Sequence, residues 1–252
     1  MAEYQEKVTE RNEFFDTIRS ALGRRSNPEM PSDIGVSALG SDADAVFARA
    51  KAIQDHVEAQ SGPLMDALSE SAATAGWKVA RVDSLDQAQE YVVGIARNVE
   101  ARLVVRSRQD VLDGDVVEAW FKPLGIQVVP MERGEDAKYS VDELRSLAER
   151  ADIGITGVNY AVAETGTCVL IPSAGISRLV SLLPPVHIAI VNRGQVLPSL
   201  DELFTMRRKD FLDGNLGSYM NLISGPSRSA DIEYTLVTGV HGPGEVHMVL
   251  VG

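Results

Sequence analysis

Short β-rich runs alternate with helical stretches between residues 77 and 156, and this alternation constrains the fold more than any other feature. The β-rich runs cover 77–82, 102–106 and 126–130, with helical patterns over 84–99 and 109–121 between them. A further helix over 140–150 leads into a strand over 152–156. Strands separated in this way pair in parallel, and their crossover helices cover both faces of the sheet. The sequence therefore predicts an α/β fold of three layers, α/β/α, around a largely parallel sheet.

The first 40 residues have a different pattern of apolar and polar residues. Apolar side chains recur there at spacings of three, four and seven, at Tyr4, Val8, Phe15, Ile18 and Leu22. Residues 23–40 then have the composition of a linker. We therefore predict an N-terminal helix and linker arm over 1–40 and one α/β domain over 41–252. The apolar stripe of the arm must cover its own domain or a second protomer, so the arm is a candidate for homo-oligomer formation.

The charge balance narrows the range of partners. The chain carries 24 Lys and Arg against 36 Asp and Glu, a net charge of −12, so its average surface repels nucleic acid and anionic lipid alike. No apolar run approaches the roughly 18 to 20 residues that span a bilayer, and the start lacks the layout of a signal peptide. We expect a cytoplasmic protein with neither a nucleic-acid nor a membrane partner.

Several signatures of cofactor and metal sites are absent from the sequence. It contains no Gly-x-Gly-x-x-Gly after a strand, no phosphate-binding Gly-x-x-x-x-Gly-Lys-Ser/Thr, no Cys-x-x-Cys and no His-Glu-x-x-His. Its four histidines show no ligand spacing, so neither a metal nor a cofactor is indicated. The single cysteine, Cys168, lies in an apolar run and is expected in the core. One cysteine excludes both an intrachain disulfide and a cysteine-rich cluster held by this chain alone.

Glu164 is the first candidate for chemistry. It stands directly before Thr165-Gly166-Thr167, and a strand follows. A turn of small residues could present its carboxylate at the end of a sheet, where ligands of α/β proteins usually bind. There it could act as a nucleophile or a general base. The alternative is an exposed glutamate that caps a turn.

A second candidate is the group formed by Ser227, Arg228 and Ser229, which follows a glycine and a proline. Two hydroxyls and a guanidinium on a flexible backbone are the components of a site for a carboxylate or phosphate. The same composition is also typical of an ordinary turn. Asp231 and Glu233 follow closely and could pair with Arg228, which would orient the guanidinium without preventing ligand contact.

Among the four histidines, His241 is the best candidate for proton exchange or ligand binding, because it lies on a turn between glycines. The alternative is a turn histidine whose partners are backbone groups. His187 and His247 occupy positions in period-two patterns and are predicted to be strand residues. His56 is expected on the solvated side of a helix.

Several of these segments together resemble the LUD domain of lactate-utilization protein C. The motifs are Ala-Glu-Thr-Gly-Thr, Gly-Pro-Ser-Arg-x-Ala-Asp-Ile-Glu and Gly-Val-His-Gly-Pro in that order, supported by the stretches 154–170 and 181–187. The resemblance covers roughly residues 60 to 252. Ser229 stands where the family usually has threonine, which keeps the hydroxyl. The linker over 23–40 matches nothing in the family.

The resemblance implies a fold similar to that of the NagB, RpiA and CoA-transferase-like group. It also implies a role in the oxidation of L-lactate to pyruvate alongside separate iron-sulfur partner proteins. The lone cysteine is consistent with that division of labour. A shared fold does not transfer a mechanism, so a CoA-transferase-like use of Glu164 is an analogy only.

Three hypotheses follow for the function. The first is an accessory, non-redox component of lactate oxidation that binds a small carboxylate or related anion. The second is a free-standing CoA-transferase-like or phosphosugar-isomerase-like enzyme that uses Glu164. The third is an assembly protein that works through its arm. The catalytic candidates are Glu164 and His241, and the predicted ligand-binding residues are Thr156, Asn159, Thr165, Gly166, Ser227, Arg228, Ser229 and Asp231. All of these assignments require the stretches around 164, 228 and 241 to meet.

Overall fold

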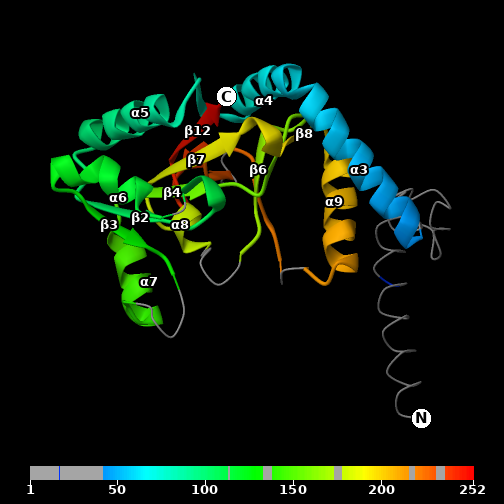
Figure 1. Cartoon of the computed structure of the whole chain (residues 1–252). Coiled ribbons are helices and arrows are strands. Elements are labelled where there is room, and N and C mark those ends of the chain that lie inside the picture. The colour runs from blue at the N-terminus through cyan, green and yellow to red at the C-terminus, as the bar shows by residue number, and fades with distance from the viewer. Residues whose placement is uncertain are drawn as a thin grey trace, which may run out of the picture. The chain divides into compact units, whose positions relative to one another are not determined.

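The computed structural model describes Thr17 and residues 42–112, 114–132, 138–172, 178–215, 219–230 and 236–252. Residues 42–252 form one compact unit, and the fold of this unit is shown in Figure 1. The predicted arm over 1–40 lies outside the described residues apart from Thr17, so the arm and its role in assembly stay predictions.

A six-stranded parallel sheet lies at the centre of the unit (Figure 1). From one edge to the other its strands are β1 (Lys78–Val82), β12 (Glu245–Val251), β7 (Val186–Asn192), β4 (Ile153–Gly157), β2 (Leu103–Arg106) and β3 (Gln127–Pro130). The neighbouring strands β12 and β7 pair in register from Glu245 with Val186 to Val251 with Asn192. Strands covered on both faces read as continuous apolar runs, as β7 does. The predicted α/β class with a largely parallel sheet is confirmed.

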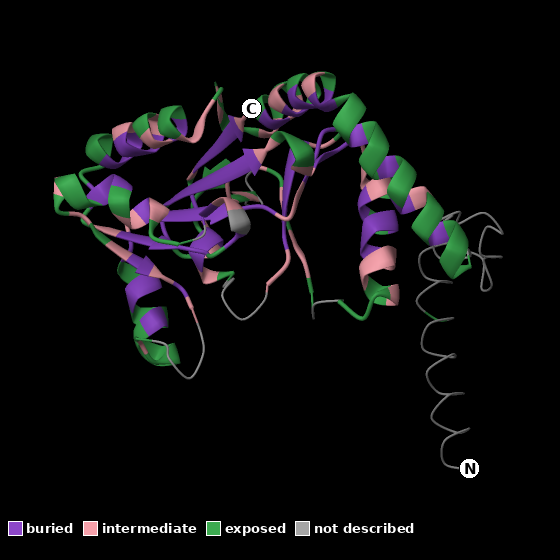
Figure 2. Ribbon diagram, viewed as in Figure 1, coloured by how far each residue is buried: buried purple, intermediate pink, exposed green. Residues whose placement is uncertain are grey.

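Helices cover both faces of this sheet, and Figure 1 shows α5 and α7 on opposite sides of it. One face packs against α5 (Leu85–Asn98) and α6 (Val116–Phe121). The other packs against α7 (Val141–Arg150), α8 (Leu179–Leu182) and α4 (Ser61–Ala75). The strands and the inward sides of the helices are buried, whereas the outer sides are exposed (Figure 2). Among the described residues, no helix is both long and apolar enough to span a bilayer.

The helix predicted over 109–121 is shorter than expected. The structure has a 3-10 turn, η1 (Asp110–Leu112), and then α6. Gly114 lies between them with a φ of +68°, which no α-helix accommodates. A second 3-10 turn, η2 (Lys122–Leu124), follows α6.

A second sheet was not predicted as a separate unit. It has four strands in the order β8 (Val196–Leu197), β5 (Tyr160–Val162), β6 (Thr167–Leu170) and β9 (Asn221–Ile223). Beyond it lies a short hairpin of β10 (Arg228–Ala230) and β11 (Leu236–Thr238). The chain between β7 and β8 forms the 3-10 turn η3 (Arg193–Gln195).

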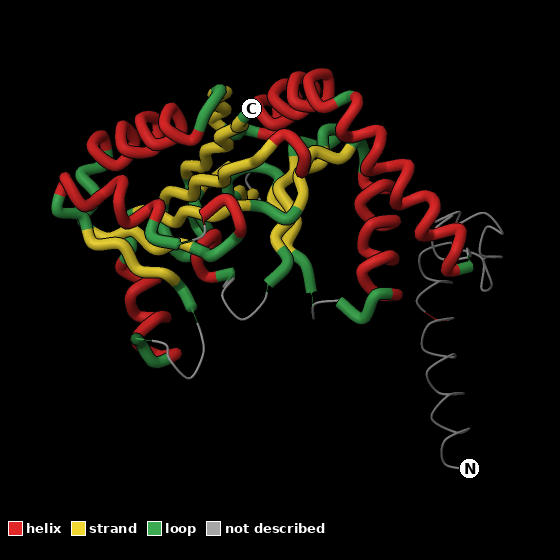
Figure 3. The backbone as a smooth tube through the Cα atoms, viewed as in Figure 1, coloured by secondary structure: helices red, strands yellow, loops and turns green. Residues whose placement is uncertain are grey.

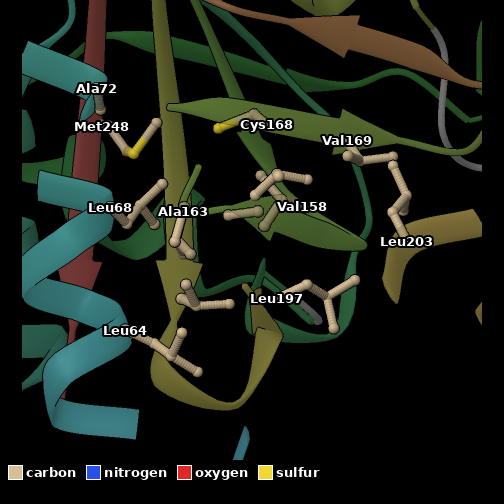
Figure 4. Close-up of a cluster of buried hydrophobic side chains, with 14 of the residues drawn as sticks. Leu64, Leu68, Ala72, Val158, Ala163, Cys168, Val169, Leu197, Leu203 and Met248 are labelled. Carbon is tan, nitrogen blue, oxygen red and sulfur yellow. The ribbon is translucent and has the colours of Figure 1, made fainter. Parts of the chain in front are cut away.

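The second sheet shares a core with α4, α3 (Ala43–Ala59) and α9 (Leu200–Leu212). Helices α3 and α9 pack against each other at one side of the unit (Figure 3). Figure 4 shows Cys168 and Val169 of β6 facing Leu68 of α4 and Leu203 of α9 across this core. Cys168 is fully buried, as predicted, and burial raises the pKa of its thiol.

Candidate functional site

The turn between β5 and β6 carries the motif around Glu164 and is held against the carboxyl end of α4. Gly166 has a φ of +63°, and a Cβ atom there would lie 2.5 Å from the backbone nitrogen of Ala72. The indole Nε1 of Trp77 donates a hydrogen bond to the carbonyl of Gly166 at 3.0 Å. The backbone therefore approaches the helix so closely that only glycine fits this position.

Hydroxyl groups connect this turn to the end of β9. The side chains of Thr165 and Thr167 are hydrogen-bonded at 2.7 Å, and Thr167 contacts the hydroxyl of Ser224 at 2.6 Å. Thr167 is buried, while Ser224 is exposed. The chain of hydroxyls thus leads from the core to the surface and could bind a polar ligand at its outer end.

Glu164 is exposed and points toward the amino end of α9. Its Oε2 atom accepts a hydrogen bond from the backbone nitrogen of Leu200 at 3.4 Å, and its own nitrogen donates to the carbonyl of Pro198. The partial positive charge at a helix amino end stabilises a carboxylate there. This geometry is that of the turn-capping alternative, and it leaves the carboxylate accessible to solvent.

Arg228 begins β10 and lies against the carboxyl end of α4. Its Nη2 atom donates to the carbonyl oxygen of Ala75 at 2.6 Å, directly beside Gly76. Carbonyl groups at a helix carboxyl end carry a partial negative charge, so this contact is favourable. A guanidinium has five N–H donors, and one contact does not exhaust them. Asp231, its predicted partner, lies outside the described residues.

His241 contacts Ser227, which directly precedes Arg228 in the sequence. The backbone nitrogen of His241 donates to the Ser227 hydroxyl at 3.3 Å, and its side chain is exposed. Ser229 pairs with Val237 in the β10–β11 hairpin and is half-buried. The backbone of His241 is therefore joined to Ser227, the residue that precedes Arg228.

Thr156 and Asn159 lie at the carboxyl end of β4 and are tied into the fold. The Thr156 hydroxyl contacts Nε2 of His187 at 2.9 Å, and Oδ1 of Asn159 accepts from the backbone of Ile171 at 2.7 Å. His187 is fully buried beside the Trp77 ring, and burial, together with nearby His247, lowers its pKa to about 3. Both side chains are thus held by hydrogen bonds within the fold.

His187 and His247 lie in β7 and β12, as predicted. His247 belongs to a polar cluster on the opposite face of the sheet, which packs against α5, and its ring contacts Tyr91 at 2.9 Å and Glu245 at 2.8 Å. Lys78 also donates to Glu245, and these two bonds hold the pKa of that carboxyl below its usual value. The cluster fastens α5 to the strands β1 and β12.

Of the predicted residues, Gly166 and Arg228 lie directly against the carboxyl end of α4. We call the candidate site formed by Thr165, Ser224, Ser227, Arg228 and His241 the α4 C-terminal surface. Glu164 belongs to the same turn but faces α9, and within the described part of the chain no hydrogen bond or ion pair joins it to Arg228 or His241. In the same part of the chain, no three His, Cys, Asp or Glu side chains are grouped to hold a metal ion.

The structure also contains a pocket that the sequence did not reveal. It lies between α3, α4, α9 and the turn η3, has a volume of about 520 Å³, and includes Arg193 among its lining residues. None of the predicted site residues lines it. The one available signal was that Arg193 directly follows the apolar strand β7. We call it the Arg193 pocket.

A family model and curated relatives identify one family. The family model of the LUD domain matches residues 65–251. The chain is 36% identical over 189 residues to "Lactate utilization protein C" of Halalkalibacterium halodurans, which covers 74% of this chain and 78% of that protein. It is 45% identical over 105 residues to the protein of the same name from Bacillus subtilis. This match covers 41% of this chain and 44% of that protein, which is less than half of each. Among solved structures it is similar to a DUF162 family protein from Deinococcus radiodurans, with a TM-score of 0.48 and 20% identity over 76% of this chain and 98% of that one.

Proposed function

The chain belongs to the LUD domain family, and on this premise we propose that it acts in lactate utilization. In this proposal it is an accessory, non-redox component of the oxidation of L-lactate to pyruvate and binds a small carboxylate or related anion at the α4 C-terminal surface. The observation that carries the proposal is the likeness, 36% identity over 189 residues, to a relative named "Lactate utilization protein C".

The geometry of the α4 C-terminal surface supports an anion as the ligand. Arg228 can present two parallel N–H donors to a carboxylate, which is the strongest arrangement for such a pair. The hydroxyl of Ser224 contacts Thr167, and the hydroxyl of Ser227 accepts from the backbone of His241. They and the His241 ring can exchange hydrogen bonds with the hydroxyl of lactate or the keto oxygen of pyruvate.

The cysteine content supports the non-redox part of the proposal. Iron-sulfur clusters are commonly held by four thiolates, and this chain has one cysteine, which is fully buried in a core. Electron transfer would therefore depend on separate iron-sulfur partner proteins. The chain itself would bind the small acid and position it or its carrier for those partners.

Calorimetric titration of the full chain with L-lactate and with pyruvate tests the proposal. We expect Arg228→Ala to weaken binding by about 2 kcal/mol, roughly 30-fold, because a charged hydrogen bond is lost. Arg145→Ala is the matched control, since Arg145 is an exposed arginine on α7 and is not part of the α4 C-terminal surface. Undiminished binding by the Arg228 variant would place the site elsewhere. Deleting the gene should slow growth of its host on L-lactate, and unchanged growth would contradict the role.

A second candidate function rests on the exposed carboxylate of Glu164. A free-standing CoA-transferase-like or phosphosugar-isomerase-like enzyme would use it as nucleophile or base. Mass spectrometry after incubation with an acyl-CoA would detect an adduct on Glu164. Glu164→Gln should then lose turnover with its fold intact. If neither effect is found, this candidate is excluded.

A further inference from the structure

We propose that the Arg193 pocket binds an amphipathic carboxylate, with one anionic head group and an apolar body larger than lactate or pyruvate. The pocket lies at the amino end of α4, whereas the α4 C-terminal surface lies at the opposite end of the same helix. The inference goes beyond the proposed function and does not depend on it.

The apolar wall of the pocket is part of a buried core. Ile53 and Val57 come from α3, Leu197 from β8 and Met206 from α9, and each side chain is at most 7% exposed. Figure 4 shows Leu197 within the cluster of buried side chains that continues beneath the pocket. Such a wall favours the apolar body of a ligand, because contact there removes apolar surface from water.

Arg193 supplies the charge that the head group needs. It follows the last residue of the central strand β7, at the carboxyl end of the parallel sheet, where ligands of α/β proteins commonly bind. Its Nε and Nη2 atoms both donate to the hydroxyl of Ser61, at 3.2 and 2.7 Å, and this contact orients the guanidinium. In the part of the chain that the structure describes, Arg193 forms no ion pair. A guanidinium that is not engaged in an ion pair within the described residues is well suited to a carboxylate.

The surroundings of Arg193 reinforce its positive charge. Ser61 is the first residue of α4, whose amino end has no side-chain cap. A helix amino end carries a partial positive charge, which adds to that of the arginine. Glu58 also lines the pocket and opposes an anion, and solvent screens the charges of both Glu58 and Arg193, because both are exposed.

Tyr160 adds a neutral hydrogen-bond donor to the pocket. Burial, and secondarily the nearby Asp210, raise the pKa of its phenol, while Arg207 lowers it by less. The phenol therefore stays protonated at neutral pH and can donate to an anionic head group. Arg193 and the apolar wall together match a carboxylate on an apolar chain, and Tyr160 lines the same pocket.

The volume of the pocket argues for a ligand larger than lactate. At about 520 Å³ it lies within the range of roughly 300 to 1,000 Å³ that is typical of sites for drug-sized molecules. A three-carbon acid would leave most of the apolar wall in contact with water. A medium-chain carboxylate such as decanoate covers the wall and reaches Arg193 with its head group.

Calorimetric titration of the full chain with decanoate, 1-decanol and L-lactate tests the proposal. We expect decanoate to bind and 1-decanol, which lacks the charge, to bind at least about tenfold more weakly. Arg193→Gln should weaken decanoate binding by a similar factor, while Arg193→Lys, which keeps the charge, should lose less. The control is Arg145→Gln, which should bind decanoate as the unaltered chain does.

Blocking the pocket provides a second, independent variant. A Cβ atom at Gly194 meets nothing within 4 Å, so Gly194→Trp should fold and fill the pocket that this residue lines. It should abolish decanoate binding, and the matched Gly94→Trp on α5, also open at its Cβ, should not. The proposal is overturned if the unaltered chain does not bind decanoate, if 1-decanol binds as tightly, or if the Arg193→Gln and Gly194→Trp variants bind decanoate normally. Lactate binding lost in Arg228→Ala alone would test the other surface separately.

Discussion

The two ends of α4 hold an arginine each, in opposite electrostatic settings. At the carboxyl end Arg228 donates to the carbonyl of Ala75, and at the amino end Arg193 donates to the hydroxyl of Ser61. The helix dipole is negative at the first position and positive at the second. An anion at Arg228 is therefore repelled by the partial negative charge of the helix carboxyl end. An anion at Arg193 is attracted both by the guanidinium and by the partial positive charge of the helix amino end. The comparison predicts that the partner of each arginine affects how strongly it can bind an anion.

The two ends also differ in packing. At the carboxyl end the backbone of Gly166 and Gly225 lies directly against the helix, and an added Cβ at either position would overlap backbone atoms of α4. At the amino end a Cβ on Gly62 or Gly194 meets nothing within 4 Å. The carboxyl end of α4 is thus tightly packed against neighbouring backbone, whereas the amino end borders the Arg193 pocket.

The largest expected effect tests this difference in packing. Gly225→Ala should lower the free energy of unfolding by about 3 kcal/mol, because Gly225 has a φ of +105° and its Cβ would overlap the carbonyl of Ala75. Gly194→Ala at the other end should change it by less than about 0.5 kcal/mol. Urea denaturation of both variants measures the effect. Equal effects would show that the two ends are packed alike.

The next effect concerns His187, which lies beneath the carboxyl end of α4 beside Trp77. Its pKa is lowered to about 3 in the folded chain, so the unfolded chain binds a proton first as the pH falls. Stability should therefore be fully present above about pH 6.5 and decrease toward pH 3, by at most about 1.4 kcal/mol per pH unit.

Replacing this histidine shows whether it causes the slope. His187→Gln should flatten the dependence of the unfolding free energy on pH, measured by urea denaturation between pH 4 and pH 7. Part of the slope should remain, because burial also lowers the pKa of His247. The exposed His56→Gln is the control. An unchanged slope in the His187 variant would contradict the assignment.

A smaller effect compares the hydroxyls at the two ends. Thr167→Val keeps the shape of a buried side chain but loses its contacts with Thr165 and Ser224, so the free energy of unfolding should fall by about 1 kcal/mol. Ser61→Ala should cost less than about 0.5 kcal/mol, because water can replace its hydroxyl at the exposed Arg193. Thermal unfolding of the two variants tests the order, and a larger loss in Ser61→Ala would reverse it.

The smallest effect tests the helix dipole directly. Arg228→Gln should lower the free energy of unfolding by about 0.5 kcal/mol, since a cation is removed from the carboxyl end of α4. Arg193→Gln removes a cation from the amino end and should not destabilise the fold. The difference should disappear in 1 M salt, which screens such interactions. A difference of opposite sign would refute the electrostatic comparison.

Much of the fold could be predicted from local patterns. The period-two runs and helical stretches predicted the parallel sheet, and the apolar setting of Cys168, His187 and His247 predicted their places in strands or core. The helix over 109–121 was predicted too long, because its pattern does not show that Gly114 adopts a positive φ. The four-stranded second sheet was missed, since its strands of two to four residues are too short to show a period.

The sequence by itself determined the α/β class, the family and the chemical types of the residues around 164, 228 and 241, because these depend on neighbouring residues and on motifs. Only the tertiary structure decided which groups meet. Arg193 and Ser61, which meet at the amino end of α4, are 132 positions apart in the sequence. Arg228 and Ala75, which meet at its carboxyl end, are 153 positions apart. No local pattern carries such contacts, because they arise when packing of the whole core brings distant turns to the same helix.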